Sequence, residues 1–123
     1  MGRSLGSAIA VHVAAHRPVE RVVLISPYDS IAAVATHHFP AALVNAIVSD
    51  RYDAAALAPR IRAPLLAIAA GRDDVIPIVH SRRLYDAWGG PKQWLELPLA
   101  GHNDLQAHDE YWQAIGKFLA DKM

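Results

Sequence analysis

The sequence predicts an α/β fold in which a parallel sheet lies between two layers of helices. Three short apolar segments of strand length alternate along the 123 residues with longer segments that read as helices. Such alternation favours a parallel sheet, because each helix carries the chain back to the start of the next strand. The first apolar segment is apolar on both faces, as strands are when helices cover both sides of the sheet.

The amino-terminal half contains one helix, one strand and a helical region. The Ala-rich run at residues 4–16 predicts a helix, which Pro18 ends. Val19–Ser26 is a β-branched run bounded by prolines, and it predicts a buried strand. Residues 27–53 contain two apolar, Ala-rich stretches separated by a proline, where we expect two short helices.

The carboxyl-terminal half adds two strands and two helices. Leu65–Ala70 predicts the second strand, and residues 80–88 predict a helix closed by two glycines and a proline. Residues 92–98 predict the third strand, near an edge of the sheet because polar residues flank Trp94. Asp109–Lys122 predicts the last helix, with acidic residues at its positive amino-terminal end and an apolar stripe along one side.

The composition excludes several classes of protein. Hydrophobic residues make up 53% and charged residues 20%, which is typical of a globular chain, here one domain over residues 1–123. Twelve basic and twelve acidic residues balance, so no nucleic acid is expected as a partner. There is no cysteine, which fits a cytoplasmic protein. No segment approaches the ~20 apolar residues of a membrane span.

Gly2-Arg3-Ser4-Leu5-Gly6 fits G-x-S-x-G, the pattern that mounts a nucleophilic serine on a sharp strand-to-helix turn. A helix begins at the serine, as that turn requires. We expect both glycines to be there for steric reasons, because side chains beside a strained serine would collide. The backbone N–H of Leu5, at the helix amino terminus, is a candidate oxyanion-hole donor.

Candidate partners for Ser4 follow the other strands. Asp73 and Asp74 lie just past the second strand, and His102 lies just past the third. The carboxyl ends of parallel strands meet at one edge of a sheet, so these side chains are expected to converge. Serine becomes a good nucleophile when histidine takes its proton, and a carboxylate orients the histidine.

The segments "GRSLGS", "LISPYDS", "RIRAPLLAIAAGRDDVIP" and "AGHNDL" together resemble the carboxyl-terminal half of an α/β-hydrolase, most similar to the serine aminopeptidase and lysophospholipase type. The resemblance implies that Ser4 is the nucleophile and His102 the general base. For the acid, spacing counted back from Pro77 selects Asp73, and spacing counted forward from Gly71 selects Asp74. We take Asp73 as the prediction and Asp74 as the alternative.

The resemblance further implies an esterase-, lipase- or lysophospholipase-type serine hydrolase that transfers an acyl group from a small ester-like substrate to water. No metal or organic cofactor is expected. Residues 27–53 are where such enzymes build a helical cover over the substrate. Tyr28, His37 and His38 are therefore candidate substrate contacts.

The resemblance also implies strands, and a second oxyanion donor, that come before the serine turn. We therefore expect a partial α/β-hydrolase fold that lacks the amino-terminal strands, with impaired hydrolysis. Val19–Ser26 would then be a bare apolar edge strand, open to a second copy or a complementing chain. The alternative function is a catalytically inactive fragment or an interaction module that docks through this edge.

Overall fold

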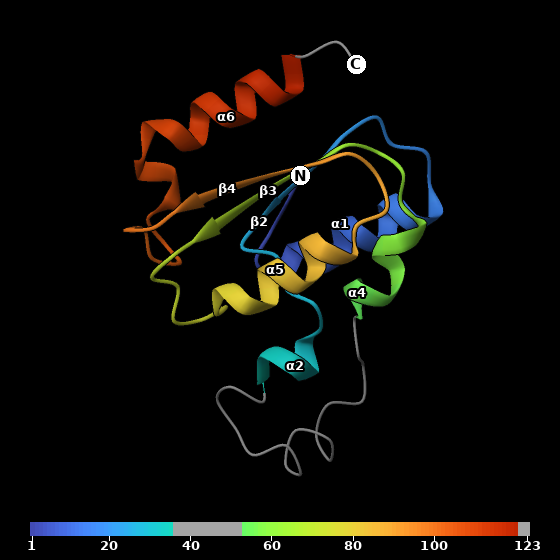
Figure 1. Ribbon diagram of the computed structural model, residues 1–123, viewed down its shortest axis with the longest axis horizontal. Helices are drawn as coiled ribbons and strands as arrows, with labels where there is room; N and C mark the ends of the chain where they lie inside the picture. Colours follow the sequence, from blue (N-terminus) through green and yellow to red (C-terminus); the bar gives the residue numbers. More distant parts are fainter. Residues whose placement is uncertain (36–52, 121–123) are drawn as a thin grey trace.

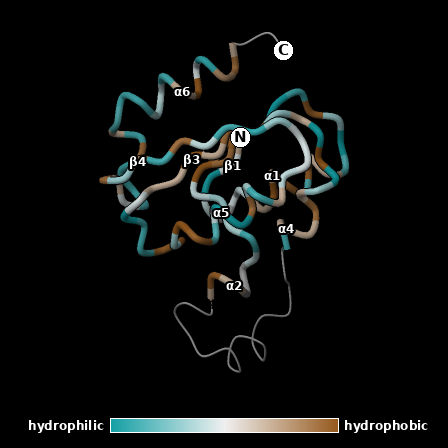
Figure 2. Tube along the Cα trace, viewed as in Figure 1, coloured by the Kyte–Doolittle hydropathy of each residue, from teal (hydrophilic) through white to brown (hydrophobic). Residues whose placement is uncertain are grey.

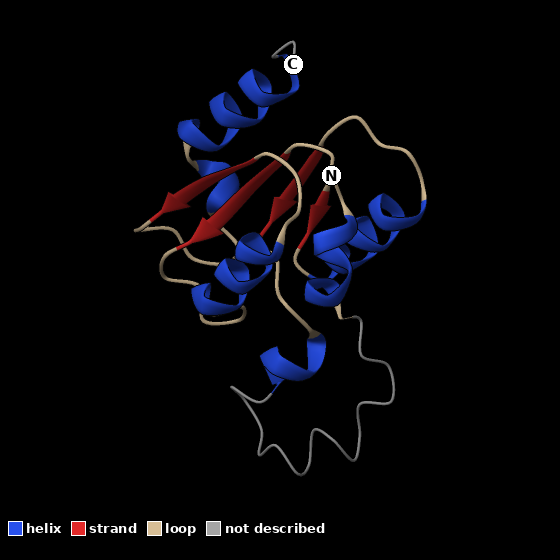
Figure 3. Ribbon diagram, turned by 45° about the vertical axis from the view of Figure 1, so that its right-hand side comes forward, coloured by secondary structure: helices blue, strands red, loops and turns tan. Residues whose placement is uncertain are grey.

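The computed structural model describes residues 1–35 and 53–120, which form a parallel sheet between two helical layers (Figure 1). Figure 3 shows the strand arrows pointing the same way, with helices on both sides. The order of the strands in the sheet follows the chain: β1 (Gly2–Arg3), β2 (Val22–Ile25), β3 (Leu65–Ala70) and β4 (Lys92–Leu97). The predicted three-layer α/β class is confirmed, and β4 lies at an edge as expected.

The helices divide between the two faces of the sheet. One face is covered by α6 (Asp109–Ala120), and the opposite face by α1 (Leu5–His16), α4 (Ala54–Leu57) and α5 (Ile78–Ala87) (Figure 1). Short 3₁₀ turns occupy Ala58–Arg60 and Leu105–Ala107. Within the predicted helical region 27–53, the structure contains α2 (Ile31–Ala35), and the second expected helix lies outside the described residues.

The sheet separates two apolar cores. Side chains alternate between faces along a strand, so Val23 and Ile25 of β2 pack toward α6, while Val22 and Leu24 pack toward α1 and α5. All four residues of β2 and all six of β3 are buried. Figure 2 shows hydrophobic stretches gathered along the central strands. Double-sided burial is the reason that these strands are apolar throughout.

The shortest strand is one that the sequence pattern missed. In β1, Gly2 pairs with Leu24 and Arg3 with Ile25, both parallel. The backbone N–H of Ser4 extends this pairing by donating to the carbonyl of Ile25 at 2.8 Å. The expectation of a wholly bare Val19–Ser26 edge is therefore wrong, because β1 covers its carboxyl-terminal part. Two residues are too few to display a strand pattern.

Close backbone packing joins the loops that follow β3 and β4. A Cβ atom on Gly71 would lie 2.6 Å from both the Cα and the carbonyl oxygen of Pro98. The backbone N–H of Gly71 donates to the carbonyl of Leu97, and that of Arg72 donates to Ala100, each at 2.9 Å. The two loops are therefore held side by side over several residues.

We predict that Gly71→Ala destabilises the fold by about 1–3 kcal/mol, because the added methyl group would meet backbone that cannot move aside. Gly116→Ala is the control, since Gly116 is exposed on α6 and the described structure places nothing within 4 Å of its added Cβ. That control is expected to gain up to about 1 kcal/mol from helix propensity. Urea unfolding measures both free energies, and equal effects of the two changes would contradict the prediction.

Candidate active site

Ser4 lies on a strained turn between β1 and α1. Its φ of 51° and ψ of −119° place a serine where side chains are costly, by roughly 1–3 kcal/mol. Gly2 allows α1 to approach β1, because a Cβ there would lie 2.7 Å from both Ala10 Cβ and the carbonyl of Gly6. Gly6 itself has no atom of the described structure within 4 Å of its added Cβ. The steric expectation is therefore right for Gly2 and wrong for Gly6.

Asp73 lies in the turn after β3, with its side chain only 2% exposed. One carboxylate oxygen, Oδ1, accepts hydrogen bonds from the backbone N–H groups of Val75 at 2.9 Å and Ile76 at 2.8 Å. The other oxygen, Oδ2, lies 2.7 Å from Nδ1 of His102. Asp74, the alternative acid, is exposed to solvent. The carboxylate that contacts His102 is thus that of Asp73.

His102 lies in the loop after β4 and contacts both other candidates. Its Nε2 is 3.1 Å from Oγ of Ser4, and its Nδ1 is 2.7 Å from Asp73. A ring nitrogen bonded to a carboxylate carries the proton, so Nδ1 donates to Asp73 and Nε2 is left to accept from Ser4. The loop is held by the backbone N–H of Gly101, which donates to Asp104 at 2.6 Å.

Arg3 joins this loop to the first strand. Its guanidinium donates to the carbonyl of His102 at 3.3 Å. Burial raises the pKa of the Tyr111 phenol on α6 above its usual 10.0, and the positive charge of Arg3 partly opposes that rise. Arg3 therefore contacts the histidine loop and also acts on the helix above it. The sequence analysis gave Arg3 no role, because it occupies a variable position of the G-x-S-x-G motif.

The remaining predicted site residues have different surroundings. Leu5 is the first residue of α1, where a backbone N–H has no acceptor within its own helix. Tyr28 is 1% exposed and packs with Ala8 and Ile76, so its role as a substrate contact stays a prediction. His37 and His38 lie outside the described residues. Among the described residues, no group of three metal-ligating side chains comes together.

Ser26 is a residue that motif analysis missed. It lies one position beyond the Arg3–Ile25 pair, beside Ser4, and its φ is 48°. Of the buried side-chain polar atoms in the described part of the chain, its Oγ is the one without a hydrogen-bond partner. The available signal was its position as the first polar residue after a buried strand.

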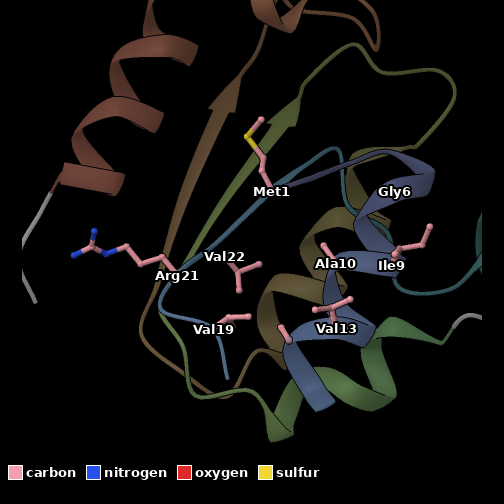
Figure 4. Close-up of a pocket in the computed structure, with 9 residues that line it drawn as sticks. Met1, Gly6, Ile9, Ala10, Val13, Val19, Arg21 and Val22 are labelled. Carbon is pink, nitrogen blue, oxygen red and sulfur yellow. The ribbon is translucent and has the colours of Figure 1, made fainter. Parts of the chain in front are cut away.

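A groove of about 310 Å³ lies between α1 and the start of β2. Figure 4 shows Met1, Val19 and Val22 on one side of it and Ala10 and Val13 on the other. Its apolar lining is exposed, with Met1 76% and Val13 46% accessible. Ser4, Asp73 and His102 are not among its lining residues, so the groove is separate from the candidate active site.

A parallel sheet with a serine on a strand-to-helix turn, and Asp and His on neighbouring loops, is the architecture of an α/β hydrolase. The chain is 30% identical, over 96% of its length, to an alpha/beta hydrolase domain-containing protein of Caenorhabditis elegans, of which it covers 34%. It superimposes with a TM-score of 0.71 and 23% identity on a monoacylglycerol lipase of Paleococcus ferrophilus, covering 96% of this chain and 66% of that one. The chain is therefore a relative of the α/β hydrolases and has part of their fold.

Other relatives are named without an activity. An uncharacterized protein of Mycobacterium tuberculosis is 38% identical over 98% of this chain, which spans only 43% of that relative. An uncharacterized membrane protein of Saccharomyces cerevisiae is 30% identical, with 98% and 45% covered. No protein-family model matches the chain. No helix within residues 1–35 and 53–120 is long and apolar enough to cross a membrane, and the cytoplasmic location stays a prediction.

Proposed function

We propose that the chain carries the catalytic residues of a serine hydrolase that transfers an acyl group from a small ester-like substrate to water. The observation that carries this proposal is the pair of contacts at His102, with Ser4 at 3.1 Å and Asp73 at 2.7 Å. Hydrolase activity is also supported by the relatives, and the named solved structures of similar fold include esterases, a lipase and an enol-lactonase.

In the first step, Nε2 of His102 takes the proton of Ser4 while Oγ of Ser4 attacks the carbonyl carbon of the ester. Asp73 accepts a hydrogen bond from Nδ1–H and stabilises the imidazolium that forms. The backbone N–H of Leu5 donates to the developing oxyanion, aided by the positive amino-terminal end of α1. The imidazolium then protonates the leaving alcohol, which leaves the acyl group on Ser4.

In the second step, water replaces the alcohol. His102 takes a proton from the water as it attacks the acyl carbon, and returns a proton to Oγ of Ser4 as the acid leaves. These two steps require no metal or organic cofactor.

Tyr28, His37 and His38 are the proposed substrate contacts. The proposed compartment is the cytoplasm, because a chain without cysteine fits a reducing compartment.

We predict that Ser4→Ala and His102→Ala each lower the rate of hydrolysis of a p-nitrophenyl ester by about 10³-fold or more. Ser4→Ala removes the attacking oxygen, and His102→Ala removes the base that takes its proton. Ser30→Ala is the control for the loss of a serine hydroxyl. The Oγ of Ser30 accepts a hydrogen bond from the backbone N–H of Ala33 in α2, and it is not one of the proposed catalytic groups. Activity that survives Ser4→Ala in the purified chain would contradict the proposal.

The two neighbouring aspartates give a matched pair. We predict that Asp73→Asn lowers kcat by between about 10² and 10⁴, because an amide no longer stabilises the imidazolium and favours the wrong tautomer of His102. Asp74→Asn, at an exposed position, is expected to change kcat less than about threefold. A larger loss of kcat in Asp74→Asn than in Asp73→Asn would instead assign Asp74 as the catalytic acid.

The groove supports a second candidate function, an interaction module that associates through its open edge. Within the part of the chain that the structure describes, β1 pairs with Leu24 and Ile25, and Val22 and Val23 have no strand partner on that side, next to exposed Ile9 and Val13 of α1. Unpaired strand edges beside apolar side chains favour the addition of a further strand. The proposed occupant is a second copy of the chain, since an edge strand can pair with its own symmetry mate about a two-fold axis.

For this candidate we predict a dimer that Val13→Glu converts to a monomer, because the substitution would place a charge in a shared groove whose lining is mostly apolar. Val79→Glu is the control, since Val79 is 41% exposed on α5 and does not line the groove. Light scattering after size-exclusion chromatography measures the mass. A monomeric wild-type chain, or a dimer that is indifferent to Val13→Glu, would exclude this function.

A further inference from the structure

A second Asp–His contact lies buried near the candidate active site. Nδ1 of His80 is 2.9 Å from Oδ1 of Asp29, and the two side chains are only 2% and 11% exposed. Oδ1 of Asp29 also accepts from the backbone N–H of Ser30 at 2.9 Å, and Arg83 approaches Oδ2 at 3.4 Å. A carboxylate is costly to bury unless it is paired and hydrogen-bonded, and Asp29 meets both conditions.

The contact joins two segments that are far apart in sequence. Asp29 follows β2, whereas His80 lies in the first turn of α5. In the same turn, Oγ of Ser81 donates to the carbonyl of Pro27 at 2.6 Å. Between these polar contacts, Tyr28 packs on Ile76. The segment Pro27–Asp29 therefore holds the start of α5 and the residues just before it.

Those residues form the turn that positions Asp73. The backbone N–H of Ile76 donates to Asp73 at 2.8 Å, Pro77 caps α5, and the helix begins at Ile78. Only three residues separate Ile76 from His80. Because this connection is so short, a displacement of the first turn of α5 would move Ile76 and alter the hydrogen bonds that orient the Asp73 carboxylate.

We propose that Asp29 is a positioning residue for the Asp73–His102 pair. By fixing His80 and the start of α5, Asp29 holds the turn in which Oδ2 of Asp73 faces Nδ1 of His102, and it does so without touching the substrate. The inference rests on the roles proposed above for Asp73 and His102. It assigns a function to a buried Asp–His hydrogen bond that takes no part in the proton transfers.

Two readouts of Asp29 variants test the inference. The first is the split between kcat and KM in ester hydrolysis. The second is the proton NMR signal of the Nδ1–H of His102, which a hydrogen bond to a carboxylate shifts far downfield and which His102→Gln identifies by its loss. Asp29→Ala removes the side-chain oxygen that contacts Ser30 and His80, whereas Asp29→Asn keeps an oxygen that can accept both hydrogen bonds.

We predict that Asp29→Ala lowers kcat by up to about 100-fold with little change in KM, because displaced catalytic groups impair chemistry more than binding. The downfield signal of His102 is expected to broaden or move, and Asp29→Asn is expected to restore both readouts largely. Asp86→Ala is the matched control, because Asp86 forms an exposed ion pair with Arg82 on the same helix. Should Asp29→Ala not fold, Asp29→Glu displaces the carboxylate by one methylene and is expected to shift the same signal.

The outcomes separate this inference from the proposed hydrolase function. An unchanged kcat and an unchanged His102 signal in the Asp29 variants would overturn the positioning role while leaving the hydrolase proposal intact. Activity that is indifferent to Ser4→Ala would instead refute the hydrolase, and the NMR signal would still report on Asp29. A wild-type chain without the downfield signal would also overturn the inference, since there would be no held pair to position.

Discussion

The parallel alignment of the four strands is the constraint on which the rest of the structure depends. Because all strands run the same way, the residues that follow them meet at one edge of the sheet, although up to 98 positions separate them in the sequence. Ser4 follows β1, Asp73 follows β3 and His102 follows β4. The contacts at His102 are thus a consequence of topology, made possible by apolar strands that can be buried on both faces.

Several costly features are concentrated at this edge. Of the described non-glycine residues, positive φ angles occur at Ser4 and Ser26, which lie side by side past β1 and β2. The unpartnered hydroxyl of Ser26 adds the cost of a buried polar group, on the order of 1–3 kcal/mol. The two apolar cores, one on each face of the sheet, offset these costs. Strain that collects at one end of a sheet is typical of a functional site.

The sequence predicted the architecture well where periodicity is strong. Leu65–Ala70 forms a strand with the expected bounds, and α6 begins at Asp109 as predicted. Pattern analysis missed the two-residue β1 and the short α4, because neither is long enough to show a period. Spacing alone left Asp73 and Asp74 open as partners of His102. That contact depends on the hydrogen bonds within the turn, which bury one carboxylate and leave its neighbour in solvent.

The most direct test of the central claim is to treat the purified chain with a fluorophosphonate and to map the modified residue by peptide mass spectrometry. The probe reacts with serines that are activated by a general base. We expect one adduct, on Ser4, which forms when the probe is added to folded protein and does not form when the protein is denatured before the probe is added. Folded protein without an adduct, or with the adduct on another serine, would contradict the assignment of Ser4 as the nucleophile and His102 as its general base.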